Sequence, residues 1–275
     1  MRHLNPLEPG VMLWAERDTL EEIHALGVRC GQMGIPGNMK LTEAAAKAWK
    51  SDLELVTMFA AYEGEDYADI PSVQRTVGFV PHKTREGREQ RTYAVSDFAA
   101  KLGIRSIACH IGFVPEDPTD PDYEDLRALV RRVCDHAAGH GQTFALETGQ
   151  EPAAVLLRFI AAVDRPNLGI NFDPANMILY GTGDPIEALR MLGPLVTSVH
   201  CKDGDWPPPE TPGALGRERP LGEGSVGMER YLRTLAEIGF RGPLNVERET
   251  ENQQERWRDI GRGIALLRSL TKGIG

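Results

Sequence analysis

The sequence predicts an α/β fold, a (β/α)8 TIM barrel, on two observations. Strand-like and helix-like segments alternate to the end of the 275-residue chain, and we count eight pairs of them. Alternation of this kind predicts a parallel sheet, and eight units with a total of about 250 residues are typical of a closed barrel. We therefore expect one domain that covers residues 1–275.

Each predicted strand is a short apolar run, and a glycine often marks the end of the helix before it. We expect strands at residues 11–15, 28–34, 53–60, 104–111, 143–148, 168–173, 196–202 and 243–248. We expect helices at residues 20–26, 42–51, 90–102, 123–138, 153–163, 185–192, 228–238 and 254–270. An open doubly wound sheet is the alternative, but it would carry a glycine-rich turn after its first strand, where this chain has WAERDT.

Two long loops interrupt this alternation. Residues 62–89 follow the third predicted strand, and residues 204–224, which include the proline-rich run WPPPETP, follow the seventh. Both loops leave the carboxyl ends of strands, the end at which barrel enzymes hold their active sites. Long loops at that end usually shape or cover a pocket, so we expect the second loop to be a lid.

Composition excludes several classes of partner. The net charge is −9, the pI is about 5.4 and no dense run of Lys and Arg occurs, so we expect no nucleic-acid partner. The first ten residues lack the apolar core of a signal peptide, and no segment approaches the ~20 apolar residues of a membrane span. Four separated cysteines without a CxxC pair indicate buried free thiols in a reducing compartment. We expect a cytoplasmic protein with no membrane partner; the sequence is compatible with a homo-oligomer.

Four residues of metal-ligand type end four successive predicted strands. They are Glu147, Asp173, His200 and Glu247, at spacings of 26, 27 and 47 residues, which suits one ligand per β/α unit. Three carboxylates and one imidazole form a borderline-to-hard set that suits Mn²⁺, Mg²⁺, Co²⁺ or Fe²⁺ and can also hold Zn²⁺. No cysteine takes part, which argues against a structural zinc site.

Strand alternation places these four residues on one face, because successive side chains point to opposite sides of a sheet. If Asp173 and His200 point inward, then so do Asn171 and Ser198, while the bulky residues between them point outward. The other two strands show the same pattern of small or polar residues on the ligand face. We therefore predict a metal held at the mouth of the barrel.

Further polar residues share the inward parity or a chelating spacing. His110 ends the fourth predicted strand and could be a metal ligand, a hydrogen-bond donor to substrate or a core histidine. Lys202 has the same parity and could polarise a substrate carbonyl or pair with Asp203. His136 and His140 have the spacing of a chelating pair, but their helix runs away from the mouth, so we expect them to be exposed to solvent.

The second half of the chain contains the stretches GINFDPANMILYGTGDPIEALRMLGPLVTSVHCKD and PLGEGSVGMERYLRTLAEIGFRGPLNVERE. With their FDPAN, VHCKD, GEG and GxLxxE elements, these stretches resemble the sugar phosphate isomerase/epimerase family. This family comprises xylose isomerase-like TIM barrels and includes ketose 3-epimerases. The elements together are specific for the superfamily and not for a substrate, and the similarity is best from about residue 110 onward.

The resemblance implies roles for the four candidate ligands. In the ketose 3-epimerase branch, a Glu, an Asp, a His and a Glu bind Mn²⁺ or a similar ion, and the two glutamates act as acid and base. These positions correspond to Glu147, Asp173, His200 and Glu247 in this chain. The resemblance therefore implies Mn²⁺ as the first choice of metal, and Glu147 and Glu247 as the catalytic pair.

Comparison with the ketose 3-epimerases suggests further substrate-binding residues besides His110 and Lys202. Asn176 stands three residues after the Asp, where the epimerases carry a His, and Trp206 stands six after the His, where they carry an Arg. Glu151 stands in, at a different spacing, for their second substrate-facing Glu. The ring of Trp206 could stack on a sugar face or an aromatic aglycone. These departures concern the substrate, whereas the metal set is complete.

The metal set and the resemblance together predict a sugar isomerase or epimerase with a small carbohydrate substrate. One glutamate would remove the proton beside a polarised carbonyl, and the other would return a proton to the enediolate. If a β-substituent left instead, the same intermediate would make the protein a lyase or dehydratase of a keto-sugar or 3-keto-glycoside. Endonuclease IV shares the fold, but its trinuclear zinc site needs more histidines, and the acidic charge disfavours DNA. A metal-bearing scaffold or sugar-binding module is the non-enzyme alternative, in which the paired glutamates would have no use.

Overall fold

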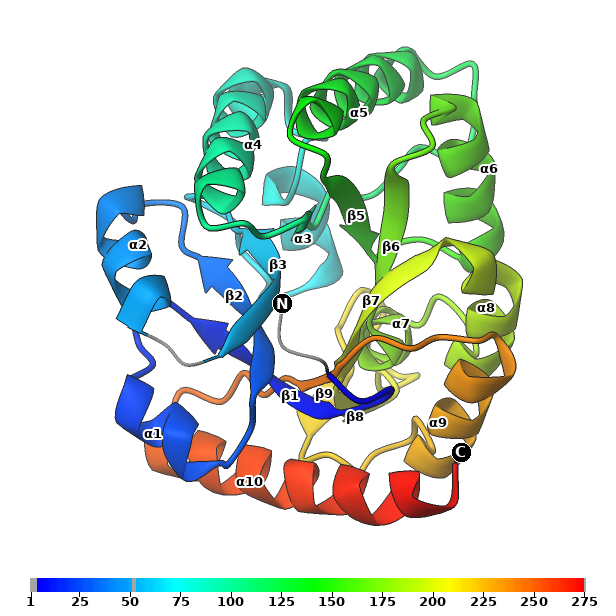
Figure 1. Ribbon diagram of the computed structural model, residues 1–275. Helices are drawn as coiled ribbons and strands as arrows, with labels where there is room; N and C mark the ends of the chain where they lie inside the picture. Colours follow the sequence, from blue (N-terminus) through cyan, green and yellow to red (C-terminus); the bar gives the residue numbers. More distant parts are fainter. Residues whose placement is uncertain (1–3, 51–52, 275) are drawn as a thin grey trace.

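The computed structural model describes residues 4–50 and 53–274 of the chain. Eight parallel strands close into a barrel in the order β1-β10-β7-β6-β5-β4-β3-β2, and helices surround it (Figure 1). The strands are β1 (Pro9–Trp14), β2 (Cys30–Ile35), β3 (Glu54–Ala60), β4 (Ser106–Cys109), β5 (Thr143–Glu147), β6 (Leu168–Phe172), β7 (Val196–Cys201) and β10 (Leu244–Val246). The predicted TIM barrel is confirmed.

The helices mostly begin at clear sequence signals. Asp120 and Asp184 each accept backbone N–H groups at a helix start, and Pro121 and Pro185 follow them at the first helical position. The predicted helix 42–51 is present, although Ser51 lies outside the described residues. The helices are α1 (Leu20–Ala25), α2 (Leu41–Lys50), α3 (Ile70–Thr76), α4 (His82–Lys101), α5 (Pro121–Gly139), α6 (Ala153–Val163), α7 (Pro174–Tyr180), α8 (Pro185–Leu192), η1 (Gly193–Leu195), α9 (Met228–Glu237), α10 (Gln253–Leu270) and η2 (Thr271–Gly273).

Much of the first predicted loop, residues 62–89, is helical. It contains α3, which Asp69 caps by accepting the backbone N–H of Ser72 at 2.7 Å, and it contains the first turns of α4. The start of α4 is strongly polar, so the apolar periodicity that revealed residues 90–102 is missing there. Tertiary contacts hold it instead: the buried guanidinium of Arg88 donates to two carbonyl oxygens at the end of α3.

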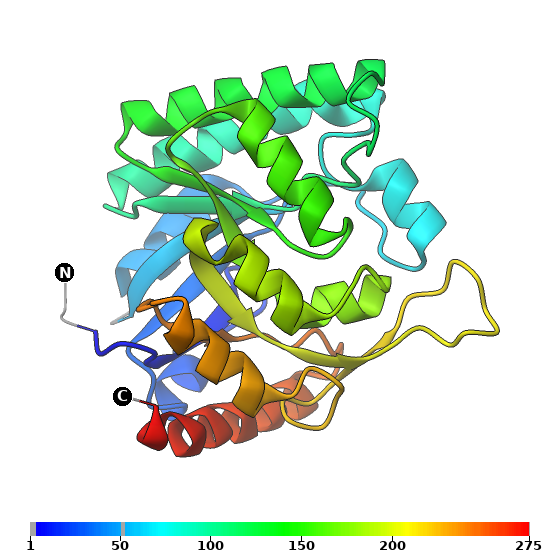
Figure 2. The same ribbon diagram turned by 90° about the vertical axis from the view of Figure 1, so that its right-hand side faces the viewer.

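The second predicted loop, residues 204–224, contains a small antiparallel sheet. In this sheet β8 (Asp203–Asp205) pairs with β9 (Arg217–Arg219), and the hairpin between them projects beyond the barrel near α3 (Figure 2). The backbone N–H of Ile70 donates to the carbonyl of Gly213 at 3.0 Å, so the hairpin and α3 touch. Because the two segments follow β7 and β3, they meet over the carboxyl ends of the strands.

Strand parity divides the core into two layers. Phe144, Phe172 and Val199 pack outward in a large cluster with helical residues, whereas Ala108 and Ala145 belong to a small cluster inside the barrel. Both assignments agree with the predicted alternation. The inner layer is thin because polar side chains take up the rest of the interior.

Two predictions from composition can be compared with the fold. All four cysteines are buried and free, as expected. In the described part of the chain, no helix is both long and apolar enough to cross a membrane.

Candidate active site

The four predicted metal ligands converge at the carboxyl end of the barrel. Glu147 ends β5, Asp173 follows β6, His200 lies in β7 and Glu247 follows β10, and none is more than 6% exposed. The Nδ1 atom of His200 lies 3.1 Å from Glu147 Oε1, 3.1 Å from Glu247 Oε2 and 3.6 Å from Asp173 Oδ2. Each residue offers one ligand atom, and these atoms all lie within 4.8 Å of one another.

Polar side chains from deeper in the barrel hold two of these ligands in place. His200 Nε2 lies 3.1 Å from Gln32 Oε1, which can only accept, so this contact directs Nδ1 toward the carboxylates. Asn171 Nδ2 donates to Glu147 Oε2 at 2.7 Å, and Gln32 and Ser198 both donate to Asn171 Oδ1. Asn171 and Ser198 were predicted to share the ligand face, whereas Gln32 was not foreseen.

Asp173 has a separate task for each of its two oxygens. Its Oδ1 accepts the backbone N–H groups of Ala175 and Asn176 at 2.8 and 3.0 Å and so caps α7, a helix that the sequence did not predict. Thr148 Oγ1 accepts the backbone N–H of Asp173 at 2.8 Å and donates to its carbonyl at 2.9 Å. The carboxylate is therefore fixed, and its Oδ2 is directed at the cluster.

The cluster fits a divalent cation. Asp173 Oδ2 and Glu247 Oε2 are buried and accept no hydrogen bond, although both lie within ion-pair distance of His200 and Lys202. Buried polar atoms without a partner are costly, and three buried carboxylates repel one another unless a cation joins them. Three carboxylates with one imidazole are also the donor set that Mn²⁺ and Mg²⁺ accept.

The charged groups of the cluster shift one another's pKa values. Burial opposes protonation of His200, but the carboxylates of Glu147 and Glu247 hold its pKa well above the ordinary value. Burial likewise opposes ionisation of Glu247, but His200 and Lys202 hold the pKa of that carboxyl well below its ordinary value. Burial raises the pKa of Asp173, and Lys202 and His200 offset part of this effect. A positive charge is therefore favoured at the centre of the cluster.

Lys202 points into the same region, as its parity predicted. Its Nζ lies 2.7 Å from Glu249 Oε2, 3.3 Å from Glu247 Oε2 and 4.0 Å from Asp173 Oδ2. These carboxylates keep the pKa of Lys202 well above its ordinary value despite burial. Of the two roles considered for Lys202, the pairing with Asp203 is not formed, because that carboxylate accepts three backbone N–H groups of the segment after β7.

A cavity of about 330 Å³ opens above the cluster. Three of the predicted substrate-binding residues, His110, Asn176 and Lys202, line it, whereas Glu151 and Trp206 lie outside its lining. The lining residues are Trp14, Phe59, Ala61, Glu65, Tyr67, His110, Glu147, Asn176, Leu179, Tyr180, Lys202, Leu215, Glu247 and Glu249. This volume is at the lower end of the range of small-molecule pockets and suits a monosaccharide.

His110 lies beside the ligand cluster and is not one of its members. Gln150 Nε2 donates to His110 Nδ1 at 3.2 Å, so the ring carries its proton on Nε2, 4.0 Å from Glu147 Oε1. Its ring lies against Phe59 and Tyr67, with centroid distances of 5.5 and 5.7 Å.

Sequence reasoning missed several residues in or beneath the site for different reasons. Glu249 follows Glu247 by two positions, so strand parity could have identified it. Gln32 is a polar residue within an otherwise apolar strand, which is a weaker signal. Tyr67 lies in the irregular segment before α3, where no periodicity exists to place it.

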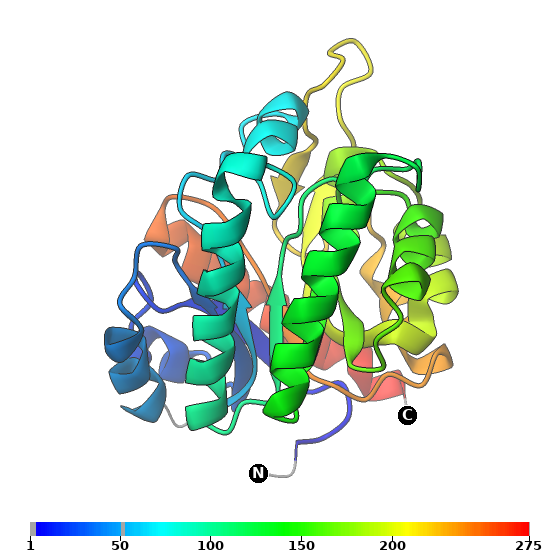
Figure 3. The ribbon, with the colours of Figure 1, turned by 90° about the horizontal axis from the view of Figure 1, so that it is seen from above.

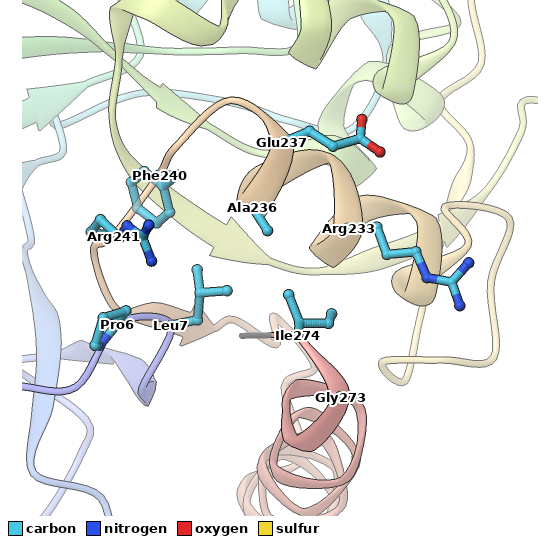
Figure 4. Close-up of a pocket in the computed structure, with 9 residues that line it drawn as sticks. All are labelled: Pro6, Leu7, Arg233, Ala236, Glu237, Phe240, Arg241, Gly273 and Ile274. Carbon is cyan, nitrogen blue, oxygen red and sulfur yellow. The ribbon is translucent and has the colours of Figure 1, made fainter.

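A larger cavity, of about 610 Å³, lies at the opposite end of the barrel (Figure 4). Helix α9, the segment from α9 to β10 and the two ends of the described chain enclose it, and Arg233 and Glu237 line it from α9. None of the four cluster residues lines it. Since barrel enzymes hold their sites at the carboxyl ends of the strands, the smaller cavity is the candidate active site.

Glu151 is a buried carboxyl group without a charged or hydrogen-bonded partner among the described residues. Neither of its carboxylate oxygens accepts a hydrogen bond, and burial raises its pKa from 4.5 to about 8. Unfolding would return the pKa to its ordinary value. As the pH rises from about 4.5 to about 8, the unfolded chain loses this proton while the native protein keeps it, so the native state loses stability.

We therefore expect Glu151→Gln to stabilise the protein relative to wild type, by an amount that grows with pH up to about 8. The full difference is on the order of several kcal/mol, because one pKa unit corresponds to about 1.4 kcal/mol. Thermal unfolding between pH 5 and pH 9 measures it, with the exposed Glu251→Gln as control. A difference between Glu151→Gln and wild type that did not change with pH would contradict the burial of an uncompensated carboxyl.

Comparison with known proteins agrees with the fold. The family model for xylose isomerase-like TIM barrels matches residues 20–270. A xylose isomerase domain protein from Planctomyces limnophilus, solved as a crystal structure, is 43% identical and superposes with a TM-score of 0.92 over 98% of this chain and 99% of that one. The chain spans about half the length of a curated relative, the uncharacterized protein MJ1311 of Methanocaldococcus jannaschii, with 26% identity over 161 residues, 54% of this chain and 52% of that protein.

More distant structures share the fold alone. A xylose isomerase-like TIM barrel protein from Mycobacterium smegmatis, solved in complex with magnesium, is 16% identical, with a TM-score of 0.71 over 98% of each chain. An L-ribulose 3-epimerase is also 16% identical, with a TM-score of 0.69 over 97% of this chain and 95% of that one. The match of the family model to almost the whole chain shows that this protein belongs to the xylose isomerase-like TIM-barrel family.

Proposed function

We propose that this protein is a divalent-metal-dependent sugar isomerase or epimerase that moves a proton at a carbon beside a carbonyl. One observation carries the proposal: Glu147 and Glu247 come from different strands, each lies 3.1 Å from His200 Nδ1, and both line the same cavity. Two carboxylates that face one substrate from different strands can take a proton from one side and return it on the other.

The chain's own residues account for binding and proton transfer. Burial opposes ionisation of Glu247, but His200 and Lys202 hold its pKa well below the ordinary value, so this carboxylate carries no proton and can only accept one. His110 presents its Nε2–H near Glu147 and can donate to a substrate oxygen there. Asn176 Nδ2 donates to Glu147 Oε1 at 3.1 Å and fixes this carboxylate.

A divalent cation bound by the four ligands would polarise the substrate carbonyl as a Lewis acid. Mn²⁺ is our first choice, with Mg²⁺, Co²⁺, Fe²⁺ and Zn²⁺ as alternatives, because the donor set is mostly carboxylate. Lys202 adds a fixed positive charge next to Glu247, because its neighbours keep it protonated.

The cavity favours an unphosphorylated sugar. Glu65, Glu147, Glu247 and Glu249 line it against one lysine, and no arginine occurs among the described lining residues. A phosphate group would face these carboxylates without the guanidinium groups that usually bind it. We therefore expect neutral ketoses, aldoses or 3-keto-glycosides as substrates.

Incubation with such sugars in D₂O tests the proposal. The metal-loaded protein is expected to exchange the proton beside the carbonyl of at least one sugar, and NMR of the product separates an epimer or isomer from an eliminated one. Elimination would make the protein a lyase that uses the same proton abstraction. If a folded, metal-loaded sample exchanged no proton of any sugar in the panel, a carbohydrate-binding role without catalysis would be favoured.

Trp206 lies outside the cavity lining, but we expect substrate preference to depend on it through the hairpin that it begins. It directly follows β8 at the base of the hairpin, and it is 45% exposed although its ring is large and apolar. We expect Trp206→Ala to raise KM or to shift preference among sugars, while metal content and Tm stay nearly unchanged. Met191→Ala, which removes an equally exposed apolar side chain from α8, is the control. A lowered Tm with unchanged KM would show that Trp206 only anchors the hairpin.

A further inference from the structure

Helices α4 and α5 lie side by side and run from the mouth of the barrel to its opposite end (Figure 3). Their contact carries a regular ladder of polar residues at four-residue intervals. Glu89, Tyr93 and Asp97 come from α4, and Arg132, His136 and His140 come from α5 and its cap. The last rung of this ladder, at the end remote from the candidate active site, joins Asp97 to the two histidines.

The three side chains of this rung already converge on one point. Asp97 Oδ1 lies 2.7 Å from His136 Nε2 and 2.8 Å from His140 Nε2. The two rings are 5.4 Å apart because residues four apart share one face of a helix. Ligand atoms of all three residues lie within 4.8 Å of one another. The sequence showed the spacing of the two histidines but not the aspartate, which is 39 residues before the first of them.

The neighbouring rungs position this group. The ring of Tyr93 stacks on His136, with centroids 4.5 Å apart and an angle of 25° between the planes. Tyr93 donates its hydroxyl to Glu89 at 2.6 Å, and Arg132 binds the same carboxylate. Burial opposes ionisation of Asp97, but its hydrogen bonds to His140 and His136 together outweigh this effect and lower its pKa. The group therefore combines an ionised carboxylate with an imidazole whose ring plane is fixed.

A second surface cluster of metal-ligand residue types differs from this one because an arginine already neutralises it. His82, Asp122 and Asp125 also lie close together, but Arg85 donates to both aspartates at 3.0 and 3.2 Å and already supplies their positive charge. Among the described residues, no Lys or Arg forms an ion pair with Asp97.

We propose that Asp97, His136 and His140 form a second metal site, which binds Zn²⁺ or a similar imidazole-preferring ion such as Cu²⁺ or Ni²⁺. Two imidazoles and one carboxylate are a typical three-ligand set for zinc, with a water completing the tetrahedron. The side chains are 31 to 47% exposed, which leaves room for that water. Because its ligands come from two helices, a bound ion would tie the end of α4 to the end of α5.

The two sites differ in the metal they prefer. The barrel cluster has three carboxylates and one imidazole, whereas the helix site has one carboxylate and two imidazoles. Mn²⁺ and Mg²⁺ prefer oxygen ligands, so they should occupy the barrel cluster alone, while Zn²⁺ should occupy both sites. The proposal does not depend on the proposed function.

Metal content of the chelator-stripped and reloaded protein tests it. After equilibration with Zn²⁺ and gel filtration, we expect two Zn²⁺ per chain in wild type, one in His140→Ala and one in Asp173→Ala, whose remaining site is the helix site. Loss of one of three ligands should weaken binding at least ~10-fold, the lower limit seen even for residues that only support a ligand. His24→Ala, which removes another exposed histidine, should retain two.

A second measurement covers the case that one variant folds poorly. In the Asp173→Ala background, Zn²⁺ should raise Tm, because an ion that binds only the native state stabilises it. Adding either His140→Ala or the milder His140→Gln should remove this rise. One Zn²⁺ per chain in wild type that is lost in Asp173→Ala and kept in His140→Ala, or two in both His136→Ala and His140→Ala, would overturn the proposal and leave a hydrogen-bonded cluster without a metal.

Discussion

Replacing Glu147 or Glu247 by glutamine should lower turnover by at least ~10²-fold, because the amide keeps the shape and one oxygen ligand but cannot accept a proton. Both carboxylates line the cavity and lie 3.1 Å from the same atom of His200. They come from different strands, so we expect each to transfer a proton that the other does not reach. Initial rates on a substrate found by deuterium exchange measure the loss.

The control for this experiment is Glu251→Gln, an exposed change outside the cavity. Metal content and Tm of the two glutamine variants should stay close to those of wild type. If either variant kept most of the wild-type rate, that glutamate would be a metal ligand without a role in proton transfer.

Removing a ligand that has no catalytic task should abolish metal binding and, with it, activity. We expect Asp173→Ala and His200→Ala to lose the bound metal, because each removes one of four donors and His200 supplies the only imidazole among them. Chelation of the wild type should have the same effect on activity, and Mn²⁺, Co²⁺ or Mg²⁺ should restore it.

His110→Ala is the control variant for this second prediction. His110 lies 4.0 Å from Glu147 Oε1 but outside the ligand cluster, so its loss should raise KM and leave metal content unchanged. Full turnover in a wild-type sample shown to be free of metal would contradict the metal dependence.

The barrel and the convergence of the four candidate ligands could be predicted because both follow from local rules. Side chains alternate along a strand, so the inward position of His200 fixes that of Ser198, and the structure shows both inside the barrel. The same rule placed Phe172 and Val199 in the outer layer, where they are found.

What could not be predicted depends on contacts between distant segments. Gln32 contacts His200 across the barrel although the two residues are 168 positions apart in the sequence. The only signal in the sequence is that Gln32 is polar within an otherwise apolar strand. Lys202 pairs with Glu249, while Asp203 accepts the backbone N–H groups of Gly222 and Val226, which lie beyond the hairpin. Trp206 was assigned to the substrate because the epimerases carry a substrate contact at the corresponding position. In the structure it begins the hairpin between β8 and β9 and does not line the cavity.

The most direct test of metal-dependent proton abstraction is a titration of the chelated protein with Mn²⁺ while deuterium exchange into substrate is followed. We predict no exchange without metal, a rise that ends at one Mn²⁺ per chain, and no rise in Glu147→Gln or Glu247→Gln although each still takes up the ion. Exchange at the full rate before any Mn²⁺ is added, or a rate that ignores both glutamine substitutions, would contradict the account.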